Sequence, residues 1–255
     1  MAQHGRPLAL VTGAGRERGI AFAVALKLAE TGWDVAFSHW PGYDSRMPWG
    51  PDLDAPGLLT AALAERGARS LAVEADLADP DAPARLFDAV EQGLGPVTAL
   101  VMLHCESVDS GLLDTTVESF DLHTAVNARG SWLLTREFAR RFTAPPEAAA
   151  GRVIAFTSDH TAGNLPYGSS KGALDRIVLA AGQELAGRGI TANVINPGPV
   201  DTGWMTQELV DTIVAATPLG RLGTPRDCAN LVAFLCSAEG GWINRQLLMS
   251  NGGLA

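Results

Sequence analysis

Tyr167 and Lys171 stand four positions apart in the run Tyr-Gly-Ser-Ser-Lys, which continues into an apolar pattern of helical spacing. Side chains four residues apart share one face of a helix, so we expect the ammonium group beside the phenol. A neighbouring positive charge favours the phenolate and lowers the pKa of a tyrosine from about 10 toward neutral pH. The pair would then make Tyr167 a general acid or base, although the same spacing is also found in solvated helix pairs without any chemistry.

A glycine-rich loop follows the first apolar run of the chain, and a helical pattern begins where the loop ends. Gly13, Gly15 and Gly19 allow a tight turn and a close approach of backbone N–H groups to a phosphate. The helix that begins at Ile20 adds the positive end of its dipole. Three residues rather than two separate Gly15 from Gly19, so the loop departs from the strict GxGxxG spacing. Its position after the first strand favours a dinucleotide site over a purely structural turn.

The end of the second apolar run bears on the choice between NAD and NADP. An NAD site usually has an acidic residue there, which binds the ribose 2′-hydroxyl. This chain has Ser38 and His39 instead, and Asp34 stands at the start of the run, where we expect a surface position. Arg16 in the glycine loop offers a positive charge to a 2′-phosphate, with His39 or Arg46 as assistants. We therefore expect NADP as the cofactor, with NAD as the alternative.

Short apolar runs alternate with helical patterns along the chain, without a linker, a repeat or a change in composition. The expected strands are Pro7–Thr12, Asp34–Ser38, Ser70–Glu74, Ala99–Leu103, Arg152–Thr157, Thr191–Ile195 and Gln246–Met249. The expected helices are Ile20–Glu30, Gly57–Arg66, Asp81–Gln92, Val117–Phe142, Gly168–Ala186 and Arg226–Ser237. Strands that are apolar on both faces and alternate with helices predict a parallel sheet covered on both sides. The fold class is therefore α/β, a doubly wound seven-stranded parallel sheet in a single Rossmann domain over residues 1–255.

Two long segments do not follow this alternation. Residues Trp40–Pro56 include four prolines and two tryptophans, which is long for a connection between a strand and a helix. Residues Pro197–Thr224 contain a short apolar helix pattern between glycines and prolines. Because loops of this length often act as lids, we expect residues 198–224 to cover a substrate site. A packed surface excursion is the alternative for either segment.

The composition excludes several classes of protein. The 255 residues carry 19 Lys and Arg against 28 Asp and Glu, a formal charge of −9, which argues against nucleic acid or an anionic membrane as a partner. No uncharged apolar stretch approaches the roughly 20 residues that span a bilayer. Cys105, Cys228 and Cys236 form neither a disulfide framework nor a metal-ligand spacing. Three scattered thiols indicate a reducing, cytoplasmic location and no bound metal.

These motifs together resemble those of the classical short-chain dehydrogenase/reductase family, and within it the 3-oxoacyl-(acyl-carrier-protein) reductase-like group. The resemblance covers nearly the whole chain. It depends on Thr12-Gly13 through Gly19-Ile20, Asp76-Leu77, Asn127-Ala128-Arg129-Gly130, Ser158, Tyr167-x-x-x-Lys171, Asn196-Pro197-Gly198 with Thr202, and the tail from Gln246 to Gly253. The order and spacing of so many motifs make the resemblance specific, which no single motif would do.

The resemblance implies a role for each matching position. Tyr167 would exchange a proton with the substrate oxygen, Lys171 would bind the nicotinamide ribose and lower the pKa of Tyr167, and Ser158 would hydrogen-bond the substrate oxygen. Asn127 would hold a water that links Lys171 to solvent, and Asp76 would accept a hydrogen bond from the adenine amino group. The implied cofactor-binding residues are Gly13, Gly15, Arg16, Gly19, Ile20, Ser38, His39, Asp76, Leu77, Pro197, Gly198 and Thr202.

The segment before Tyr167 departs from the family pattern. Ser158 precedes Tyr167 by nine residues, fewer than is usual in the family, which predicts a shortened loop and a more open substrate site. Thr157 and Thr161 are the alternative candidates for the hydroxyl role.

Two other departures concern the cofactor side. Met102-Leu103-His104-Cys105 replaces the family's Asn-Asn-Ala-Gly, and the bulk of His104 and Cys105 would crowd the cofactor or shift the central helix. The lengthened glycine loop is similar to that of the divergent enoyl reductases of the same superfamily. Those enzymes have a wider Tyr-to-Lys spacing, so the spacing here favours carbonyl over enoyl reduction.

The sequence thus predicts an NADP-preferring oxidoreductase that interconverts a ketone and a secondary alcohol on a small carbonyl or acyl-thioester substrate. A non-catalytic dinucleotide-binding regulator or scaffold of the same fold is the alternative. In the family the helices at about 117–142 and 168–187 form a dimer face, so we expect a homo-oligomer, either a dimer or a tetramer. The identity of the substrate does not follow, because this fold and these residues serve many substrates.

Overall fold

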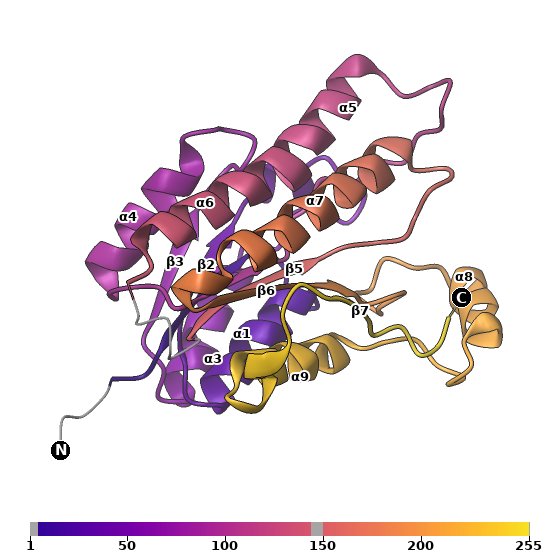
Figure 1. The fold of residues 1–255 in the computed structure, drawn as a ribbon. Coiled ribbons are helices and arrows are strands. Elements are labelled where there is room, and N and C mark those ends of the chain that lie inside the picture. Colours follow the sequence, from indigo (N-terminus) through magenta and orange to yellow (C-terminus); the bar gives the residue numbers. More distant parts are fainter. Residues whose placement is uncertain (1–4, 144–149, 255) are drawn as a thin grey trace.

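Seven parallel strands form one sheet in the order β3-β2-β1-β4-β5-β6-β7 (Figure 1). The structure, a computed structural model, describes residues 5–143 and 150–254. The strands are β1 (Leu8–Thr12), β2 (Asp34–His39), β3 (Ser70–Glu74), β4 (Ala99–Met102), β5 (Gly151–Phe156), β6 (Ile190–Asn196) and β7 (Leu247–Met249). The strand order reverses between β1 and β4. The crevice at the carboxyl ends of these two strands is where sheets of this kind bind their ligands.

Helices cover both faces of the sheet. They are α1 (Ile20–Glu30), α2 (Pro41–Asp44), α3 (Ala55–Glu65), α4 (Ala82–Gly93), α5 (Val117–His123), α6 (Ser131–Arg141), α7 (Leu165–Glu184), α8 (Gln207–Ala216) and α9 (Pro225–Cys236). Figure 1 shows α1, α3 and α9 on one face and α4, α6 and α7 on the other. The doubly wound α/β fold is therefore confirmed. Within the described part of the chain, no helix combines the length and the apolar character needed to cross a membrane.

The central strands are buried on both sides because alternate residues belong to two separate apolar cores. Val11 of β1 and Phe37 of β2 pack in the core on the side of α1 and α9. Leu10 of β1 and Leu100 of β4 pack in the core on the side of α4, α6 and α7. All four side chains are fully buried. The glycine loop that follows β1 therefore starts from a strand whose register is fixed on both faces.

The helix predicted over Val117–Phe142 is divided into three parts. A π-helical segment, Thr124–Gly130, lies between α5 and α6. Such segments contain wider turns than an α-helix and occur frequently at functional sites. Asn127 lies in the middle of the segment and is fully buried. The local widening thus coincides with one of the predicted catalytic residues.

The prediction that Asp34 is a surface residue is wrong, because its side chain is only 2% exposed. It accepts hydrogen bonds from the backbone N–H of Arg69 at 2.8 Å and from Arg69 Nε at 2.7 Å. Arg6 Nε lies 3.6 Å from the same carboxylate. A buried carboxylate is tolerated only when it has such partners. Asp34 therefore joins the start of β2 to the chain before β1 and before β3.

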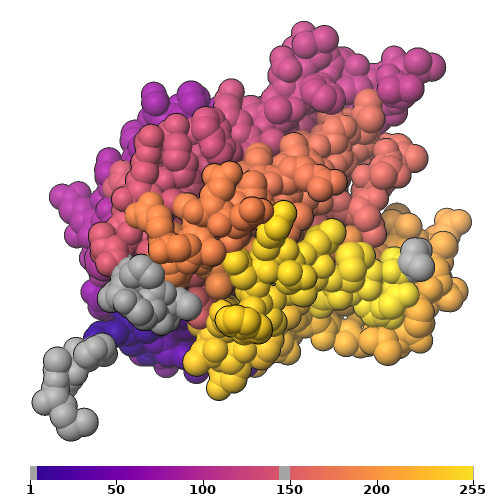
Figure 2. Space-filling model, in the orientation of Figure 1, coloured from indigo at the N-terminus to yellow at the C-terminus, as the bar shows by residue number. Residues whose placement is uncertain are grey.

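The two irregular segments extend from the carboxyl side of the sheet. The first contains α2 and leads into α3. The second contains α8, which has no buried residue in Gln207–Ala216. Figure 2 shows the orange part of the chain around α8 standing out beside the yellow C-terminal part. A helix without buried residues is compatible with the predicted lid at residues 198–224. The lid itself stays a prediction.

Candidate active site

Tyr167 and Lys171 lie on one face of the first turns of α7, beside the carboxyl end of β5. Lys171 Nζ is 5.6 Å from the centroid of the Tyr167 ring. The same Nζ atom donates a hydrogen bond to the carbonyl oxygen of Phe156, the last residue of β5, at 2.9 Å. Lys171 is only 3% exposed, so its ammonium group is held in a dry environment. The structure therefore brings together the two residues that the sequence singles out first.

The pKa of Tyr167 is raised in this arrangement and not lowered as the spacing predicts. Burial raises the pKa of Tyr167 above its ordinary value, and the neighbouring Cys105 raises it further. A hydrogen bond with Ser158 acts in the opposite direction but does not compensate. Burial also lowers the pKa of Lys171, since desolvation disfavours its charged form. Tyr167 is therefore a protonated phenol at neutral pH, which suits a proton donor.

The shortened loop before α7 contains Ser158, the predicted hydroxyl partner of Tyr167. Ser158, two residues beyond β5, makes the hydrogen bond with Tyr167 that lowers the pKa of the phenol. The alternative Thr157 is buried, and its Oγ1 lies 3.4 Å from the backbone oxygen of Lys171. The other alternative, Thr161, is exposed in the loop. Of the three hydroxyl residues, Ser158 is the one whose interaction lowers the pKa of the Tyr167 phenol, and its Oγ also accepts a hydrogen bond from the N–H of His160 at 3.2 Å.

Asn127 connects the segment after β4 to α7. Its Oδ1 accepts a hydrogen bond from the backbone N–H of Glu106 at 2.8 Å, and its Nδ2 donates to the carbonyl oxygen of Glu106 at 2.9 Å. Nδ2 also donates to Ser170 Oγ at 2.8 Å. Both amide hydrogens are therefore used, and the side chain braces the site one residue before Lys171 in the chain. The predicted water relay through Asn127 would have to use other atoms than this amide nitrogen.

His104 does not crowd the site but turns into the protein. Its Nδ1 is 2.7 Å from Thr12 Oγ1, and its Nε2 is 3.2 Å from the carbonyl oxygen of Val126. Burial lowers the pKa of His104 to about 3, so the imidazole is neutral. It joins the end of β1 to the π-helical segment. Cys105, half-buried beside Tyr167, has a pKa raised by burial and is therefore a thiol rather than a thiolate.

The glycine loop has the geometry that phosphate binding requires. Gly13 has a φ of +81°, and a Cβ atom there would lie 2.7 Å from the backbone nitrogen of His104. The N–H of Ala14 donates to the carbonyl oxygen of Ser38 at 2.8 Å, which fixes the loop against β2. Gly19 caps α1 without any side-chain acceptor. The first N–H groups of α1, beginning at Ile20, therefore face the crevice without a side-chain cap, as an anion site requires.

Arg16 connects the glycine loop to both irregular segments. Its guanidinium lies 5.1 Å from the centroid of the Trp49 ring, and its Nη2 donates to the carbonyl oxygen of Thr202 at 3.1 Å. Arg18 forms an exposed ion pair with Asp201 at 3.4 Å. The family motif predicts Thr202, and the structure places it against the glycine loop although the two lie 186 positions apart in the chain.

The residues after β6 form the opposite wall of the crevice. Gly198 has a φ of +59°, and its N–H donates to Asn196 Oδ1 at 3.0 Å. A Cβ atom on Gly198 would lie 2.5 Å from the Cβ of Asn251, so no other residue fits this turn. The turn at Pro197 and Gly198 thus holds the start of residues 198–224 at a fixed point on the edge of the sheet.

A cavity of about 180 Å³ lies between the glycine loop, the end of β2 and the first irregular segment. Its walls are formed by Gly15, His39, Pro41, Asp44, Pro51, Asp52, Leu53, Pro56 and Glu74. Although β2 does not end in an acidic residue, Asp44, Asp52 and Glu74 place three carboxylates in the wall of this cavity. Sequence reasoning missed this because Asp44 and Asp52 belong to the irregular segment. Glu74 was detectable, since it ends β3 and is paired with His39 in the sheet.

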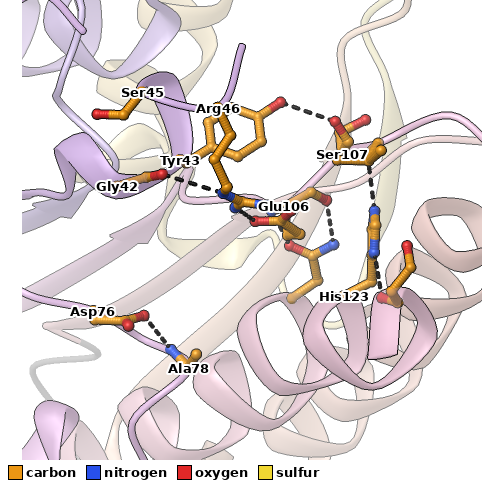
Figure 3. Close-up of polar contacts among 12 residues, drawn as sticks. Gly42, Tyr43, Ser45, Arg46, Asp76, Ala78, Glu106, Ser107 and His123 are labelled. Atoms are coloured by element: carbon orange, nitrogen blue, oxygen red, sulfur yellow. Dashed lines mark hydrogen bonds and ion pairs between the residues drawn. The ribbon is translucent and has the colours of Figure 1, made fainter. Parts of the chain in front are cut away.

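Asp76 and Leu77 lie beyond the end of β3. Asp76 Oδ1 accepts a hydrogen bond from the N–H of Ala78 at 2.9 Å (Figure 3). Leu77 is buried in the core with α4 and α6. The second carboxylate oxygen of Asp76 makes no hydrogen bond among the described residues, so it could accept one from an adenine amino group.

The site fits a nicotinamide dinucleotide on two observations. The first turn of α1 faces the crevice without a side-chain cap. Lys171 uses one of its three ammonium hydrogens within the part of the chain described here, which leaves donors for the hydroxyls of a ribose. A Rossmann-type sheet with such a loop and a Tyr–Lys pair at its carboxyl edge defines a dinucleotide-dependent oxidoreductase. The described residues contain no cluster of three side chains that would hold a metal ion.

Comparisons with known proteins agree with this class. A family model described as enoyl-(acyl-carrier-protein) reductase matches residues 13–255. An uncharacterized oxidoreductase, YjdA of Bacillus subtilis, is 36% identical over 99% of this chain and 98% of its own length. An NADPH-dependent aldehyde reductase-like chloroplastic protein of Arabidopsis thaliana is 33% identical over 96% of this chain and 93% of its own. The structure of a blue fluorescent protein from a metagenomic library in complex with NADPH superimposes with a TM-score of 0.85, at 29% identity over 98% of both chains.

The chain therefore belongs to the short-chain dehydrogenase/reductase family.

Proposed function

We propose that this protein is an NADP(H)-dependent oxidoreductase that reduces a carbonyl group to an alcohol, with Tyr167 as the proton donor. The observation that carries the proposal is the position of Tyr167, half-buried on the face of α7 that also carries Lys171, with Lys171 Nζ 5.6 Å from the centroid of its ring. Its phenol is protonated, because burial raises its pKa. A carbonyl oxygen bound at Ser158 would lie within reach of the phenol. The alternative of a non-catalytic regulator gives no reason for this arrangement.

Each residue of the site would have a separate task. The nicotinamide, when bound, supplies the hydride for the carbonyl carbon. Ser158 would hold the carbonyl oxygen, and Tyr167 would deliver its phenolic proton to that oxygen as negative charge develops there. Lys171 would stabilise the phenolate that Tyr167 becomes, because its ammonium already faces the ring in a buried environment. Asn127 would keep α7 and the segment after β4 at a fixed separation.

The preference for NADPH is supported by the Arabidopsis relative and by the NADPH complex of the structural neighbour. Arg16 is the cation that the glycine loop offers to a 2′-phosphate. Its contacts are the Trp49 ring and the backbone oxygen of Thr202, and its charge also offsets part of the rise that burial causes in the pKa of Asp44. The carboxylates of Asp44, Asp52 and Glu74 in the adjacent cavity act against this preference.

For the substrate we propose a small ketone or aldehyde. The curated relatives include proteins named as NADPH-dependent aldehyde reductases. A 3-oxoacyl thioester stays in the proposal as a second substrate class, as the sequence motifs predict. We further propose that residues 198–224 form a lid over the substrate, that the protein is a cytoplasmic homo-oligomer, and that it binds neither nucleic acid nor membranes.

The test is the oxidation of NADPH, followed by its absorbance, with a panel of aldehydes, ketones, a 3-oxoacyl thioester and an enoyl thioester. We expect turnover of at least one carbonyl class by the wild type and its loss in Tyr167→Phe. Turnover of the enoyl thioester alone would replace carbonyl reduction by enoyl reduction. NADPH binding without turnover of any carbonyl compound, and without any effect of Tyr167→Phe, would favour the regulator.

A further inference from the structure

The segment between β2 and α3 is tied to the segment after β4 by two side chains. Arg46 forms a two-fold hydrogen-bonded ion pair with Glu106, with Nη–Oε distances of 3.0 and 2.6 Å (Figure 3). The hydroxyl of Tyr43 donates to the carbonyl oxygen of Ser107 at 3.0 Å (Figure 3). Since β1 lies between β2 and β4 in the sheet, these contacts carry residues 41–54 across the carboxyl end of β1. We call residues 41–54 the strap.

Glu106 is an unusual partner because it is nearly inaccessible to solvent. Its side chain is 4% exposed, whereas that of Arg46 is 45% exposed. A carboxylate that is buried to this extent needs a paired cation, and Arg46 meets the need with a planar, two-pronged contact. The backbone of Glu106 is at the same time held by both ends of the Asn127 amide. The residue that anchors one end of the strap is therefore itself held by Asn127.

The strap also closes the cavity beside the glycine loop. Asp52 Oδ2 accepts a hydrogen bond from the backbone N–H of Glu17 at 3.1 Å. Trp49 donates through Nε1 to Asp44 Oδ1 at 2.8 Å and stacks against Arg16. Strap residues form one wall of the 180 Å³ cavity, with Gly15 and His39 on the other. A space of this size is below the range of about 300–1,000 Å³ that holds a whole small ligand, so it suits one half of a dinucleotide.

We propose that the strap closes over the adenosine half of the cofactor and that the Arg46–Glu106 ion pair is the latch that holds it closed. The adenosine end of a dinucleotide binds at the end of β2, on the side of the crevice that the strap covers. Arg46 and Glu106 are thus positioning residues, which act on cofactor retention and not on the proton transfer at Tyr167. The proposal rests on the proposed function, because it assumes that a dinucleotide is the ligand.

The first experiment measures the latch without any turnover. The bond after Arg46 is a trypsin site within the strap, so cleavage there, followed by mass spectrometry, reports how often the strap opens. In Glu106→Gln the charge is removed with little change in volume. We expect cleavage after Arg46 to be about ten-fold faster in this variant than in the wild type, and to be slowed in the wild type by NADPH. Arg226→Gln is the matched control, because Arg226 makes a similar two-pronged pair with Glu30 far from the strap.

The second experiment separates the two halves of the cofactor. We expect Glu106→Gln to release NADPH about ten-fold faster in stopped-flow fluorescence and to bind adenosine 2′,5′-bisphosphate or AMP about ten-fold more weakly. Turnover with reduced nicotinamide mononucleotide, which lacks the adenosine half, should equal that of the wild type. Arg46→Lys keeps the charge but loses the planar guanidinium fork, so its rate of NADPH release should lie between those of the wild type and Glu106→Gln.

Three results would overturn the latch. In the first, Glu106→Gln is cleaved and releases NADPH at the same rates as Arg226→Gln. In the second, Glu106→Gln binds the adenosine probes as tightly as the wild type does. In the third, Glu106→Gln loses as much turnover with reduced nicotinamide mononucleotide as with NADPH. The last result would assign Glu106 to the chemistry through Asn127. If the wild type binds neither NADPH nor NADH, the proposed function fails, and the assignment of the covered ligand as adenosine fails with it. The trypsin comparison of Glu106→Gln with Arg226→Gln would still decide whether the ion pair holds the strap.

Discussion

Lys171 Nζ faces the ring of Tyr167 at 5.6 Å from its centroid, but its hydrogen bond goes to the carbonyl oxygen of Phe156 at 2.9 Å. The ammonium is thus anchored to the sheet and not to the phenol. Because burial raises the pKa of Tyr167, the phenol keeps its proton until an acceptor takes it. The resting phenol therefore has a proton to donate, as the proposed carbonyl reduction requires.

Tyr167→Phe should lower the rate of carbonyl reduction by about 10²–10⁴-fold, since it removes the general acid. NADPH affinity, measured by fluorescence titration, should change less than about two-fold, because the ring that faces Lys171 remains. Ser169→Ala, at an exposed position of the same helix, serves as the control and should leave the rate unchanged. Equal turnover by Tyr167→Phe and the wild type would exclude Tyr167 as the proton donor.

Carbonyl reduction should be nearly independent of pH from about 7 to 9 and decline at higher pH. The donor is the protonated phenol, and the pKa of Tyr167 is raised by burial above its ordinary value near 10. The rate therefore falls as the pH rises through that pKa and not before it. A pH profile of kcat/KM under saturating NADPH tests this expectation. A decline centred near neutral pH would show that Tyr167 is already ionised there.

Arg16→Ala should weaken NADPH binding about ten-fold and NADH binding less than two-fold, because a 2′-phosphate loses its cation while a 2′-hydroxyl does not. The comparison is made by titrating both cofactors. Arg18→Ala is the matched control, since Arg18 lies in the same loop in an exposed pair with Asp201. An equal loss of NADH and NADPH affinity in Arg16→Ala would instead assign Arg16 to loop geometry through its contacts with Trp49 and Thr202.

Acid should destabilise the fold through His104. Its pKa is about 3 in the folded state and near 6.5 when unfolded, so the unfolded chain binds one more proton between these values. The contribution of His104 is therefore fully present above pH 6.5 and is lost as the pH falls toward 3, at up to about 1.4 kcal/mol per pH unit. Urea unfolding from pH 6.5 to 4.5 should show this slope in the wild type.

The slope should become smaller in His104→Gln and stay unchanged in His160→Gln. His160, an exposed histidine in the loop before α7, is the control. A slope that is identical in all three proteins would mean that carboxylates, and not His104, account for the acid sensitivity.

Asp34→Asn should lower the free energy of unfolding by about 1–3 kcal/mol, because it weakens the charge-assisted contacts of a buried carboxylate with Arg69 and Arg6. Asp201→Asn, in an exposed pair with Arg18, should cost less than about 1 kcal/mol. Urea denaturation measures both. Equal effects of the two substitutions would show that burial of Asp34 adds nothing to its pairing.

The glycine loop and the Tyr167–Lys171 pair were predictable because their signals are local. Apolar runs at Leu8–Thr12 and Ala99–Met102 specify buried strands without any knowledge of their neighbours. The glycines at 13, 15 and 19 and the four-residue step from Tyr167 to Lys171 lie within single segments. Parallel strands all end at one edge of the sheet, so these segments had to meet once the fold class was known.

The environment of those residues was decided only by the tertiary structure. Asp34 is buried because Arg69 reaches it from the next connection, and Arg46 finds Glu106 across 60 residues of chain. The direction of the Tyr167 pKa shift follows from how deeply α7 is packed, which no spacing reveals. The sequence by itself determined the fold, the family and the residues proposed to react, because short-range patterns encode them. Burial, charge balance in the cavity and the closure of the strap depend on contacts between distant segments, and only the folded chain defines them.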